Sequence, residues 1–261
     1  MQQFLARWMG EPASAHGPSL DSMNALVHWL MAVLFVGWGL YFIYVLFRFR
    51  ASRNPTASYK GAQSHFSTYT EAGVVLVEAI LLIGFAIPAW AKWVTPHEEG
   101  SNPVEVRVVG EQFAWNAHYP GADGVFGTVK PELVDPTNPV GLDRSDPAGQ
   151  DDIISINQLH LPVDRPAAIR LTSKDVIHSF GLNMMRVKQD AIPGMEIPVY
   201  FTPVKVTPPE SVFPACAASK TCWEISCAQL CGLGHYRMRG FLVVHEQADF
   251  DAWLEAQAPK T

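Results

Sequence analysis

The sequence predicts a membrane-anchored protein in which a hairpin of two transmembrane helices is followed by a small β-sandwich or barrel outside the membrane. Two observations lead to this fold class. Two long apolar runs are confined to the N-terminal part of the 261-residue chain, which has only 17% charged residues. The rest of the chain carries short β-branched runs separated by Pro, Gly and Asp, which is typical of a small antiparallel β-domain.

The apolar runs are long enough to cross a bilayer. Residues 25–47 contain no formal charge, and residues 72–91 contain a single acid, Glu78. Each run reaches the roughly 20 residues that a transmembrane helix needs. A cleaved signal peptide is not expected, because the first run is too long and a basic cluster follows it instead of preceding it. The expected spans are residues 25–48 and 72–94.

Basic residues determine the expected orientation. The connection between the two runs carries four of them: Arg48, Arg50, Arg53 and Lys60. Short basic loops remain in the cytoplasm. We therefore expect a protein of the bacterial inner membrane, with both termini and the outer domain on the periplasmic side, although Lys92 after the second run argues weakly against this.

The chain is expected to have three parts. Residues 1–24 form a short amphipathic preamble of unassigned role, residues 25–95 the helical hairpin, and residues 96–261 the outer domain. Within the outer domain, residues 121–151 are rich in Gly, Pro and Asp and are expected to be irregular. Residues 248–255 are expected to form a short amphipathic helix. The β-rich runs are residues 104–109, 153–157, 168–171, 199–201 and 240–245.

The outer domain is acidic. From residue 96 onward there are 21 Asp and Glu against 13 Lys and Arg, a net charge of −8, whereas the preceding part has a net charge of +2. Such an excess favours solubility, and it also suits attraction of a basic redox partner. We expect no nucleic-acid partner.

A possible metal site lies near the C-terminus, where four potential ligands fall within twelve residues: Cys227, Cys231, His235 and Met238. Thiolate, imidazole and thioether are soft to borderline ligands, which select copper over magnesium or calcium. The second cysteine, four residues after the first, allows two thiolates to face each other across a loop and bridge two metal ions. Such a site needs a further ligand from upstream, and His178 is the best candidate.

The cysteines could also serve a purpose other than copper binding. Cys227 and Cys231 could form a disulfide beside a core histidine, or all four cysteines could bind zinc or an iron–sulfur cluster. The cysteines lack the paired spacing of zinc ribbons and fingers, and the spacings of iron–sulfur ligands are missing as well. A lone histidine or methionine would favour simple packing, but the combination favours copper.

This loop closely resembles the binuclear copper (CuA) loop of cytochrome c oxidase subunit II, Cys-x3-Cys-x3-His-x2-Met. His178 lies in Asp175-Val-Ile-His-Ser179, which is similar to the Asp-Val-x-His-Ser segment around the first copper histidine of that family. Residues 190–194, Asp-Ala-Ile-Pro-Gly, are a further hallmark of the family. The resemblance covers residues 24 to about 256 and implies a cupredoxin-like Greek-key β-sandwich for the outer domain.

The resemblance implies six ligands for two copper ions: His178, Cys227, the backbone carbonyl of Gln229, Cys231, His235 and Met238. In this family the two thiolates bridge the ions, each imidazole holds one ion, and the thioether and the carbonyl are weak axial ligands. Gly232 and Gly234 are expected to let the loop turn where a side chain would collide with the coppers. Haems and a further copper, CuB, are expected in subunit I and not in this chain.

Two positions depart from the family pattern. Gln229 replaces the commoner Glu, and a neutral amide is a poorer ligand for a hard cation, so a magnesium site is left unassigned. Phe113 replaces the first tryptophan of the Gln-Trp-x-Trp segment, which receives the electron from cytochrome c, while Trp115 matches the second. Because Phe is a poorer redox relay, the usual path is not expected to operate unchanged, and Trp115 or Tyr119 is a candidate to line the donor surface.

Cys216 and Cys222 match no ligand position. In an oxidising compartment, two such cysteines six residues apart are expected to form a disulfide. No c-type haem motif is present, and none is expected to be fused to the domain.

Glu71 and Glu78 lie seven residues, or two helical turns, apart on one face of the second apolar run. An acid inside the membrane indicates function, and Glu71 matches the family's carboxylate at the mouth of a proton pathway into subunit I. Glu78 has no clear counterpart. It either belongs to the proton pathway or is a buried acid bonded to subunit I.

The sequence therefore predicts subunit II of a respiratory haem–copper terminal oxidase. It would accept electrons from cytochrome c, or from a c-type cytochrome held in a supercomplex, and pass them to haem in subunit I for oxygen reduction coupled to proton transport. We lean to the tethered donor, because the segment that receives electrons is altered. The alternatives are the copper subunit of a related nitric oxide reductase and a membrane-anchored copper-binding protein. A quinol-oxidase subunit is disfavoured, because it lacks the copper ligands.

Overall fold

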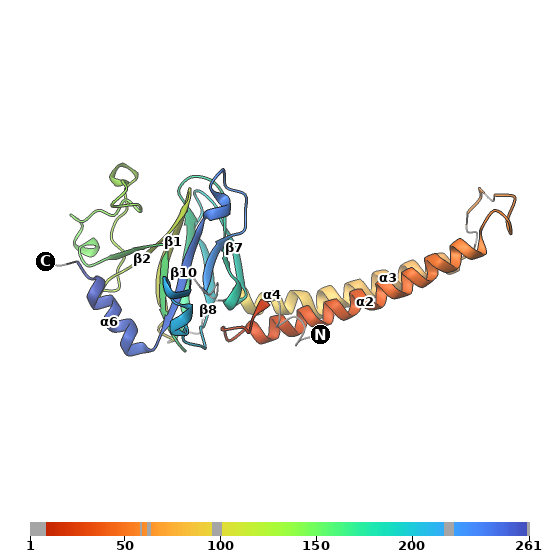
Figure 1. The fold of residues 1–261 in the computed structure, drawn as a ribbon, viewed down its shortest axis with the longest axis horizontal. Helices are drawn as coiled ribbons and strands as arrows, with labels where there is room; N and C mark the ends of the chain where they lie inside the picture. Colours follow the sequence, from red (N-terminus) through yellow and green to blue (C-terminus); the bar gives the residue numbers. More distant parts are fainter. Residues whose placement is uncertain (1–8, 58, 62–63, 96–100, 217–221, 260–261) are drawn as a thin grey trace. The chain divides into compact units, whose positions relative to one another are not determined.

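The computed structural model describes residues 9–57, 59–61, 64–95, 101–216 and 222–259. Residues 1–8 of the predicted preamble and residues 96–100, where the predicted outer domain begins, lie outside the described residues. The chain divides into two compact units (Figure 1). A helical unit contains residues 21–95, and a β-rich unit contains residues 9–20 together with the chain from residue 101 onward.

The helical unit consists of two long antiparallel helical segments. The first, α2 (Gly17–Arg48), begins at Gly17 instead of near residue 25. The second runs without a break through α3 (Phe66–Leu81), the π-turn η1 (Leu82–Ala86) and α4 (Ile87–Val94). Pro88 at the start of α4 lacks an N–H and crowds the preceding turn, which accounts for the wider π-turn just before it.

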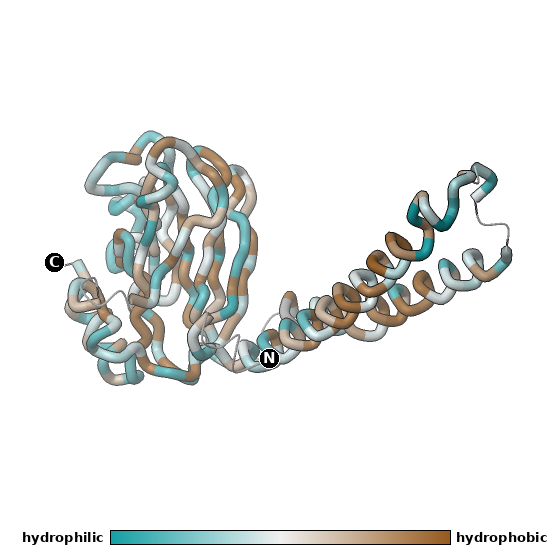
Figure 2. Tube along the Cα trace, turned by 45° about the vertical axis from the view of Figure 1, so that its right-hand side comes forward, coloured by the Kyte–Doolittle hydropathy of each residue, from teal (hydrophilic) through white to brown (hydrophobic). Residues whose placement is uncertain are grey.

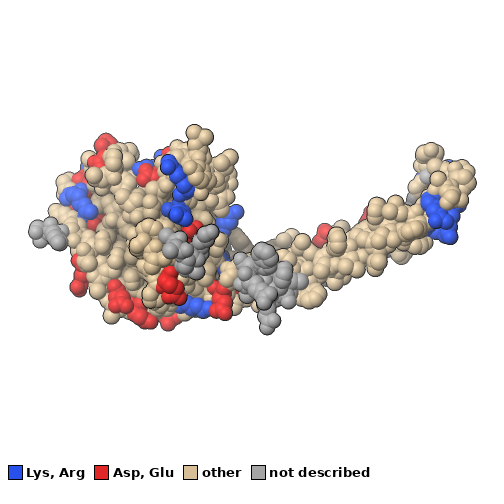
Figure 3. All heavy atoms as spheres, in the orientation of Figure 1, with Lys and Arg blue, Asp and Glu red and all other residues tan. Residues whose placement is uncertain are grey.

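Both segments are long and apolar enough to cross a membrane, and none of the residues in their most apolar windows is buried within the structure. Figure 2 shows the hydrophobic residues distributed around both helices instead of along one stripe. A helix that is apolar on all sides needs an apolar surrounding. The prediction of two apolar N-terminal helices is confirmed, and the basic residues gather at the connection between them (Figure 3).

The β-rich unit is a sandwich of two five-stranded sheets. The first sheet has the order β3 (Ile153–Ile156), β2 (Ala114–Tyr119), β1 (Val104–Glu111), β5 (Ala167–Ser173) and β8 (Ile197–Phe201). The second has the order β4 (Gln158–Pro162), β10 (Arg239–His245), β9 (Glu224–Cys227), β6 (His178–Leu182) and β7 (Val187–Ala191). Each of the five β-rich runs expected from the sequence forms a strand.

The sandwich is not purely antiparallel. β1 pairs with β5 in parallel, with Val108 opposite Leu171, and β10 pairs with β4 in parallel, with Val243 opposite His160. The expectation of an antiparallel domain is therefore wrong for these two pairs. In both cases the paired strands are far apart in the sequence, so no turn motif could reveal their direction.

Alternating residues of the two sheets fill the space between them. Val106, Ile169 and Leu171 of the first sheet and Leu161 and Phe180 of the second are completely buried. Each such side chain contributes about 1.5–3 kcal/mol to folding. This core holds the ends of β6 and β9, which carry metal-ligand candidates, in fixed positions.

Residues 121–151 are irregular, as expected, apart from the short 3-10 turns η2 (Pro131–Leu133) and η3 (Pro147–Gly149). They make a second small apolar cluster with the first sheet, formed by Val109, Val140, Leu142 and Ile154. The C-terminal helix α6 (Gln247–Gln257) also forms as expected.

The segment before α2 belongs to the β-rich unit, whereas the sequence interpretation set it apart as a preamble. Ala13 is completely buried, its N–H donates to the main-chain oxygen of Met184 (2.7 Å), and its own oxygen accepts from the N–H of Val204 (2.8 Å). The Ser14 hydroxyl donates to the main-chain oxygen of Met185 (2.7 Å). Residues 13–14 therefore complete the edge of the sandwich.

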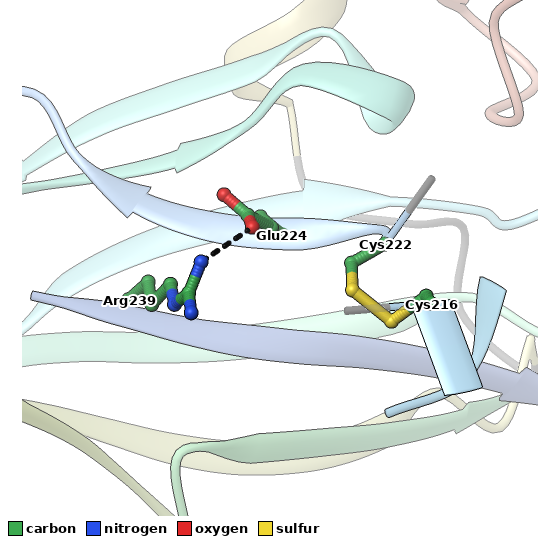
Figure 4. The surroundings of a disulfide bond; sticks show 4 residues. All are labelled: Cys216, Cys222, Glu224 and Arg239. Carbon is green, nitrogen blue, oxygen red and sulfur yellow. Dashed lines mark hydrogen bonds and ion pairs between the residues drawn. A yellow bond between two sulfur atoms is a disulfide. The ribbon is translucent and has the colours of Figure 1, made fainter. Parts of the chain in front are cut away.

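The structure joins Cys216 and Cys222 in a disulfide, the pairing expected from the sequence (Figure 4). The bridge lies just before β9, and the neighbouring pair Glu224–Arg239 links β9 to β10 at 3.3 Å. The other two cysteines are free thiols.

Candidate metal centre

The candidate centre lies where β9 leaves the second sheet. β9 ends at Cys227, and the chain loops back through the 3-10 turn η6 (His235–Arg237) before β10 begins at Arg239. β6 is the antiparallel neighbour of β9, with Phe180 opposite Cys227, and its first residue is His178. The sheet thus places His178 beside a loop that is distant in the sequence.

The sulfur atoms form the middle of the cluster. The Sγ atoms of Cys227 and Cys231 are 3.8 Å apart, which is too far for a disulfide of about 2.05 Å. Cys227 Sγ lies 3.9 Å from His178 Nδ1, and Cys231 Sγ lies 3.6 Å from His235 Nδ1. Each thiol therefore faces one imidazole nitrogen.

The two weaker ligand candidates lie against the same sulfurs. The main-chain oxygen of Gln229 is 3.2 Å from Cys227 Sγ, and Met238 Sδ is 3.7 Å from Cys231 Sγ. All six side-chain or main-chain groups expected from the sequence are therefore brought to one place. Of these, His178, Cys231 and Met238 are buried, and Cys227 and His235 are partly exposed.

The hydrogen bonds of His178 identify its ligand atom. Its Nε2 lies 2.8 Å from the Asp175 carboxylate, an acceptor, so Nε2 carries the proton. The lone pair is then on Nδ1, the nitrogen that faces Cys227. A carboxylate partner on the second nitrogen is the usual arrangement for a metal-ligating histidine.

The separation of the thiols suits metal ions held between them. A metal–thiolate bond is about 2.3 Å long, so one ion can contact two sulfurs up to about twice that distance apart, and 3.8 Å lies within this limit. Burial and, to a lesser extent, the neighbouring Cys227 raise the pKa of the Cys231 thiol to about 11. A bound metal would take the place of the thiol protons.

The turn between β1 and β2 packs against the loop that carries the candidate ligands. A Cβ on Gly234 would meet the ring of Phe113, and a Cβ on Gly232 would lie 2.7 Å from the Gln112 amide nitrogen. The φ of Gly232 is +135°, which favours glycine for a second reason. The sequence interpretation attributed these glycines to collision with the coppers, but in the structure Phe113 and Gln112 fill the space beside them.

Two residues proposed for electron transfer do not lie at the surface. Trp115 is 1% exposed and Tyr119 is 2% exposed, because the odd-numbered positions of β2 point into the core. The suggestion that either lines a donor surface is therefore wrong. Trp115 instead packs edge-on against His178, with ring centroids 6.0 Å apart. Phe113 is half-buried under the loop.

Glu71 and Glu78 both lie on α3, in the helical unit. Glu71 Oε1 accepts a hydrogen bond from the Ser67 hydroxyl (3.1 Å), one turn earlier. Neither acid belongs to the metal cluster.

Sequence reasoning missed the roles of Asp175 and Gln112. Burial is the largest influence on the pKa of Asp175 and raises it, but hydrogen bonds from His178, the Gln112 N–H and the Val176 N–H together bring this pKa below its usual range. Asp175 precedes the candidate ligand His178 by three residues, and this spacing is the signal that could have identified it.

Comparison with known proteins places these features in a family. A family model described as the periplasmic domain of cytochrome c oxidase subunit II matches residues 104–245. The alternative cytochrome c oxidase subunit 2 of Bradyrhizobium diazoefficiens is 31% identical over 252 residues, which cover 96% of this chain and 84% of that protein. Cytochrome c oxidase subunit 2 of Synechocystis is 30% identical over 62% of this chain and 36% of its own length.

Among solved structures, the periplasmic domain of subunit II of cytochrome oxidase from Bradyrhizobium japonicum matches with a TM-score of 0.41 and 25% identity. The match covers 62% of this chain and 95% of that one.

Proposed function

The chain belongs to the cytochrome c oxidase subunit II family, and from this premise we propose that its ligand cluster holds a binuclear CuA centre through which electrons enter a haem–copper oxidase. The observation that carries the proposal is the pairing of donors. Two free thiols lie 3.8 Å apart, and each faces a different imidazole nitrogen. A mononuclear site needs only one thiolate and leaves the second without a role.

The proposed ligands have distinct roles. Cys227 and Cys231 would supply the two thiolates, His178 and His235 one imidazole each, and the Gln229 carbonyl and the Met238 thioether the two weaker donors. When bound, two copper ions that share an unpaired electron through sulfur change their bond lengths little on reduction. The protein contributes rigidity, because β6 and β9 hold their ligands in one sheet. It also excludes water from the site, because His178, Cys231 and Met238 are buried.

The wider assignment follows from the family and the charge pattern. We place the helical hairpin in a bacterial inner membrane with the basic connection at the cytoplasmic side, and the outer domain, from about residue 96, on the periplasmic side. The chain would pass electrons to haem in subunit I, where oxygen is reduced. Glu71 and Glu78 on α3 are proposed to serve proton transport at the contact with subunit I.

The donor is proposed to be a c-type cytochrome, held near the oxidase in a supercomplex in preference to diffusing freely. An acidic domain attracts a basic donor, but exposed charges act strongly only within about 8 Å at physiological ionic strength. Turnover with soluble cytochrome c across a salt series tests this proposal. Fast reduction that falls steeply with salt would refute the tethered donor and favour a diffusing one.

The central test uses the full-length chain loaded with copper. Metal analysis should give two coppers per chain, and the electron paramagnetic resonance spectrum should show one electron coupled to two equivalent copper nuclei. Cys227→Ser should abolish this coupling. Gln229→Ala is the matched control in the same loop, because it retains the carbonyl. One copper per chain, or zinc in the native protein, would refute the binuclear assignment.

A further inference from the structure

The carboxylate of Asp175 serves two separate elements at once. Its Oδ1 accepts a hydrogen bond from His178 Nε2 (2.8 Å), and its Oδ2 accepts one from the main-chain N–H of Gln112 (2.7 Å). His178 belongs to β6 in the second sheet, whereas Gln112 lies in the turn after β1 of the first sheet. The carboxylate therefore joins the two layers of the sandwich at the metal centre.

The side chain of Gln112 continues this connection to the loop. Its Nε2 donates to the main-chain oxygen of Cys231 (2.5 Å). The next residue is Gly232, where any side chain would collide with the same amide nitrogen, so the backbone and the amide fit closely. A continuous path of hydrogen bonds thus runs from His178 through Asp175 and Gln112 to Cys231.

The charge of Asp175 is not neutralised by the lysine beside it. Lys174 forms an ion pair with Glu111 and donates to the main-chain oxygen of Pro139 (3.1 Å). On its own loop, Oδ1 accepts from two neutral donors, the Val176 N–H (2.6 Å) and the hydroxyl of Ser173 (3.4 Å). The negative charge is therefore directed at His178 through a charge-assisted hydrogen bond.

We propose that Asp175 and Gln112 form a positioning clamp, which fixes the His178 ring and the Cys231 end of the loop relative to each other. This inference rests on the proposed binuclear centre, and it assigns to Gln112 a role that does not involve electron transfer. Asp175 keeps the proton on Nε2 and strengthens Nδ1 as a donor, which favours the oxidised metal. Gln112 holds the loop in register but carries no charge, so it affects retention of the metal more than its potential.

The two residues make different predictions for the copper-loaded full-length chain. Asp175→Asn replaces one carboxylate oxygen by an NH₂ group, which cannot accept a hydrogen bond from the N–H that it faces, and it removes the charge. Its reduction potential should rise, and its copper affinity should fall by about 10–100-fold, as is typical when such a partner is lost. Gln112→Met removes only the donor to Cys231. It should release copper to a chelator faster, with a smaller change in potential.

The double variant distinguishes a clamp from two independent contacts. Because the residues act in series, the loss of copper affinity in Asp175→Asn/Gln112→Met should be smaller than the product of the single losses. Asp135→Asn is the matched control, since it makes the same charge change in a carboxylate whose hydrogen bonds, among the described residues, stay within residues 135–138. Its potential and affinity should equal those of the wild type.

The outcomes separate this inference from the proposed function. If the wild-type chain does not bind two coppers, the proposed function fails before any variant is made. If it does, and both single variants keep the wild-type potential and chelator kinetics, the clamp is refuted. If Asp175→Asn does not fold, Gln112→Met alone decides, because it leaves the Asp175 carboxylate and its bond to His178 intact. If Gln112→Met then releases copper to the chelator at the wild-type rate, the clamp is refuted.

Discussion

The contact between Gly234 and Phe113 gives the sharpest test of how the loop is supported. Gly234 has φ −92° and ψ 6°, the conformation of the third residue of a type I turn, which is open to alanine. An added Cβ would nevertheless lie 2.6 Å from Cγ and Cε2 of the Phe113 ring and closer still to Cδ2. Carbon atoms normally approach no closer than about 3.5 Å. Gly234→Ala therefore introduces overpacking alone.

The expected cost of Gly234→Ala is about 1–3 kcal/mol, the usual range for an extra carbon in a packed site. For a unit of this size, each kcal/mol lowers the melting temperature by about 2–4 °C. Phe113→Ala removes the clashing ring and should itself cost less than the ~3–5 kcal/mol of a fully buried phenylalanine, because Phe113 is half-buried.

The decisive measurement is a double-mutant cycle on the thermal unfolding of the full-length chain. In the Phe113→Ala background, Gly234→Ala should cost about nothing, so the two changes should be coupled by about 1–3 kcal/mol. Copper retention should rank the variants in the same order as their thermal stability, since Gly234 precedes the ligand candidate His235. Equal costs of Gly234→Ala in both backgrounds would show that the ring does not support the loop.

Three further predictions concern the rest of the β-rich unit. Burial and, to a lesser extent, the nearby His245 lower the pKa of His160 to about 3. Only the unfolded chain therefore gains this proton as the pH falls from about 6.5 toward 3. Stability should therefore fall toward pH 3, by up to about 1.4 kcal/mol per pH unit from this group, and His160→Phe should flatten that slope in denaturant titrations. Ala13→Glu, which buries a charge at a completely buried position, should lower the melting temperature strongly, whereas the exposed Glu11→Ala should change it little. Replacing Cys216 and Cys222 by serine should lower the free energy of unfolding by about 2 kcal/mol, because the disulfide closes only a short loop. The copper content should not change. An empty copper site in folded protein would show instead that the disulfide supports the centre.

The candidate ligands that the structure brings together could be chosen from the sequence, because coordination chemistry demands particular residue types at short, fixed spacings. Cys227, Cys231 and His235 are close in the chain, so a loop brings them together. The residues that flank His178 identify it as a candidate ligand, although its position beside the cysteine loop depends on the pairing of β6 with β9. That pairing carries no local signal, since β6 (HSFGL) and β9 (EISC) are short and mix polar with apolar residues.

The contacts of Gln112 and the burial of Trp115 and Tyr119 differ in how far the sequence could predict them. Gln112 contacts the loop through a main-chain oxygen 119 residues away, and the Cys231 side chain gives no indication of such a contact. The burial of Trp115 and Tyr119, however, could have been predicted from the sequence. Asn116 and His118 alternate with them, and strict alternation over a strand predicts that the large apolar residues point to the core.

The structural role of Phe113 bears on its replacement of tryptophan. Its ring lies against Gly232 and Gly234, and Arg237 lies over it at 5.9 Å from the centroid. The position therefore requires a flat, bulky side chain for mechanical support of the loop, whether or not it carries electrons. A phenylalanine meets that requirement but is a poor redox relay. Phenylalanine thus supports the loop, and under the proposed function an electron from the donor would reach the ligands by a path other than this ring. Phe113→Trp, which introduces an indole in place of the phenyl ring, should leave copper binding unchanged. It should speed reduction by soluble cytochrome c only if the path, and not the donor contact, limits the rate.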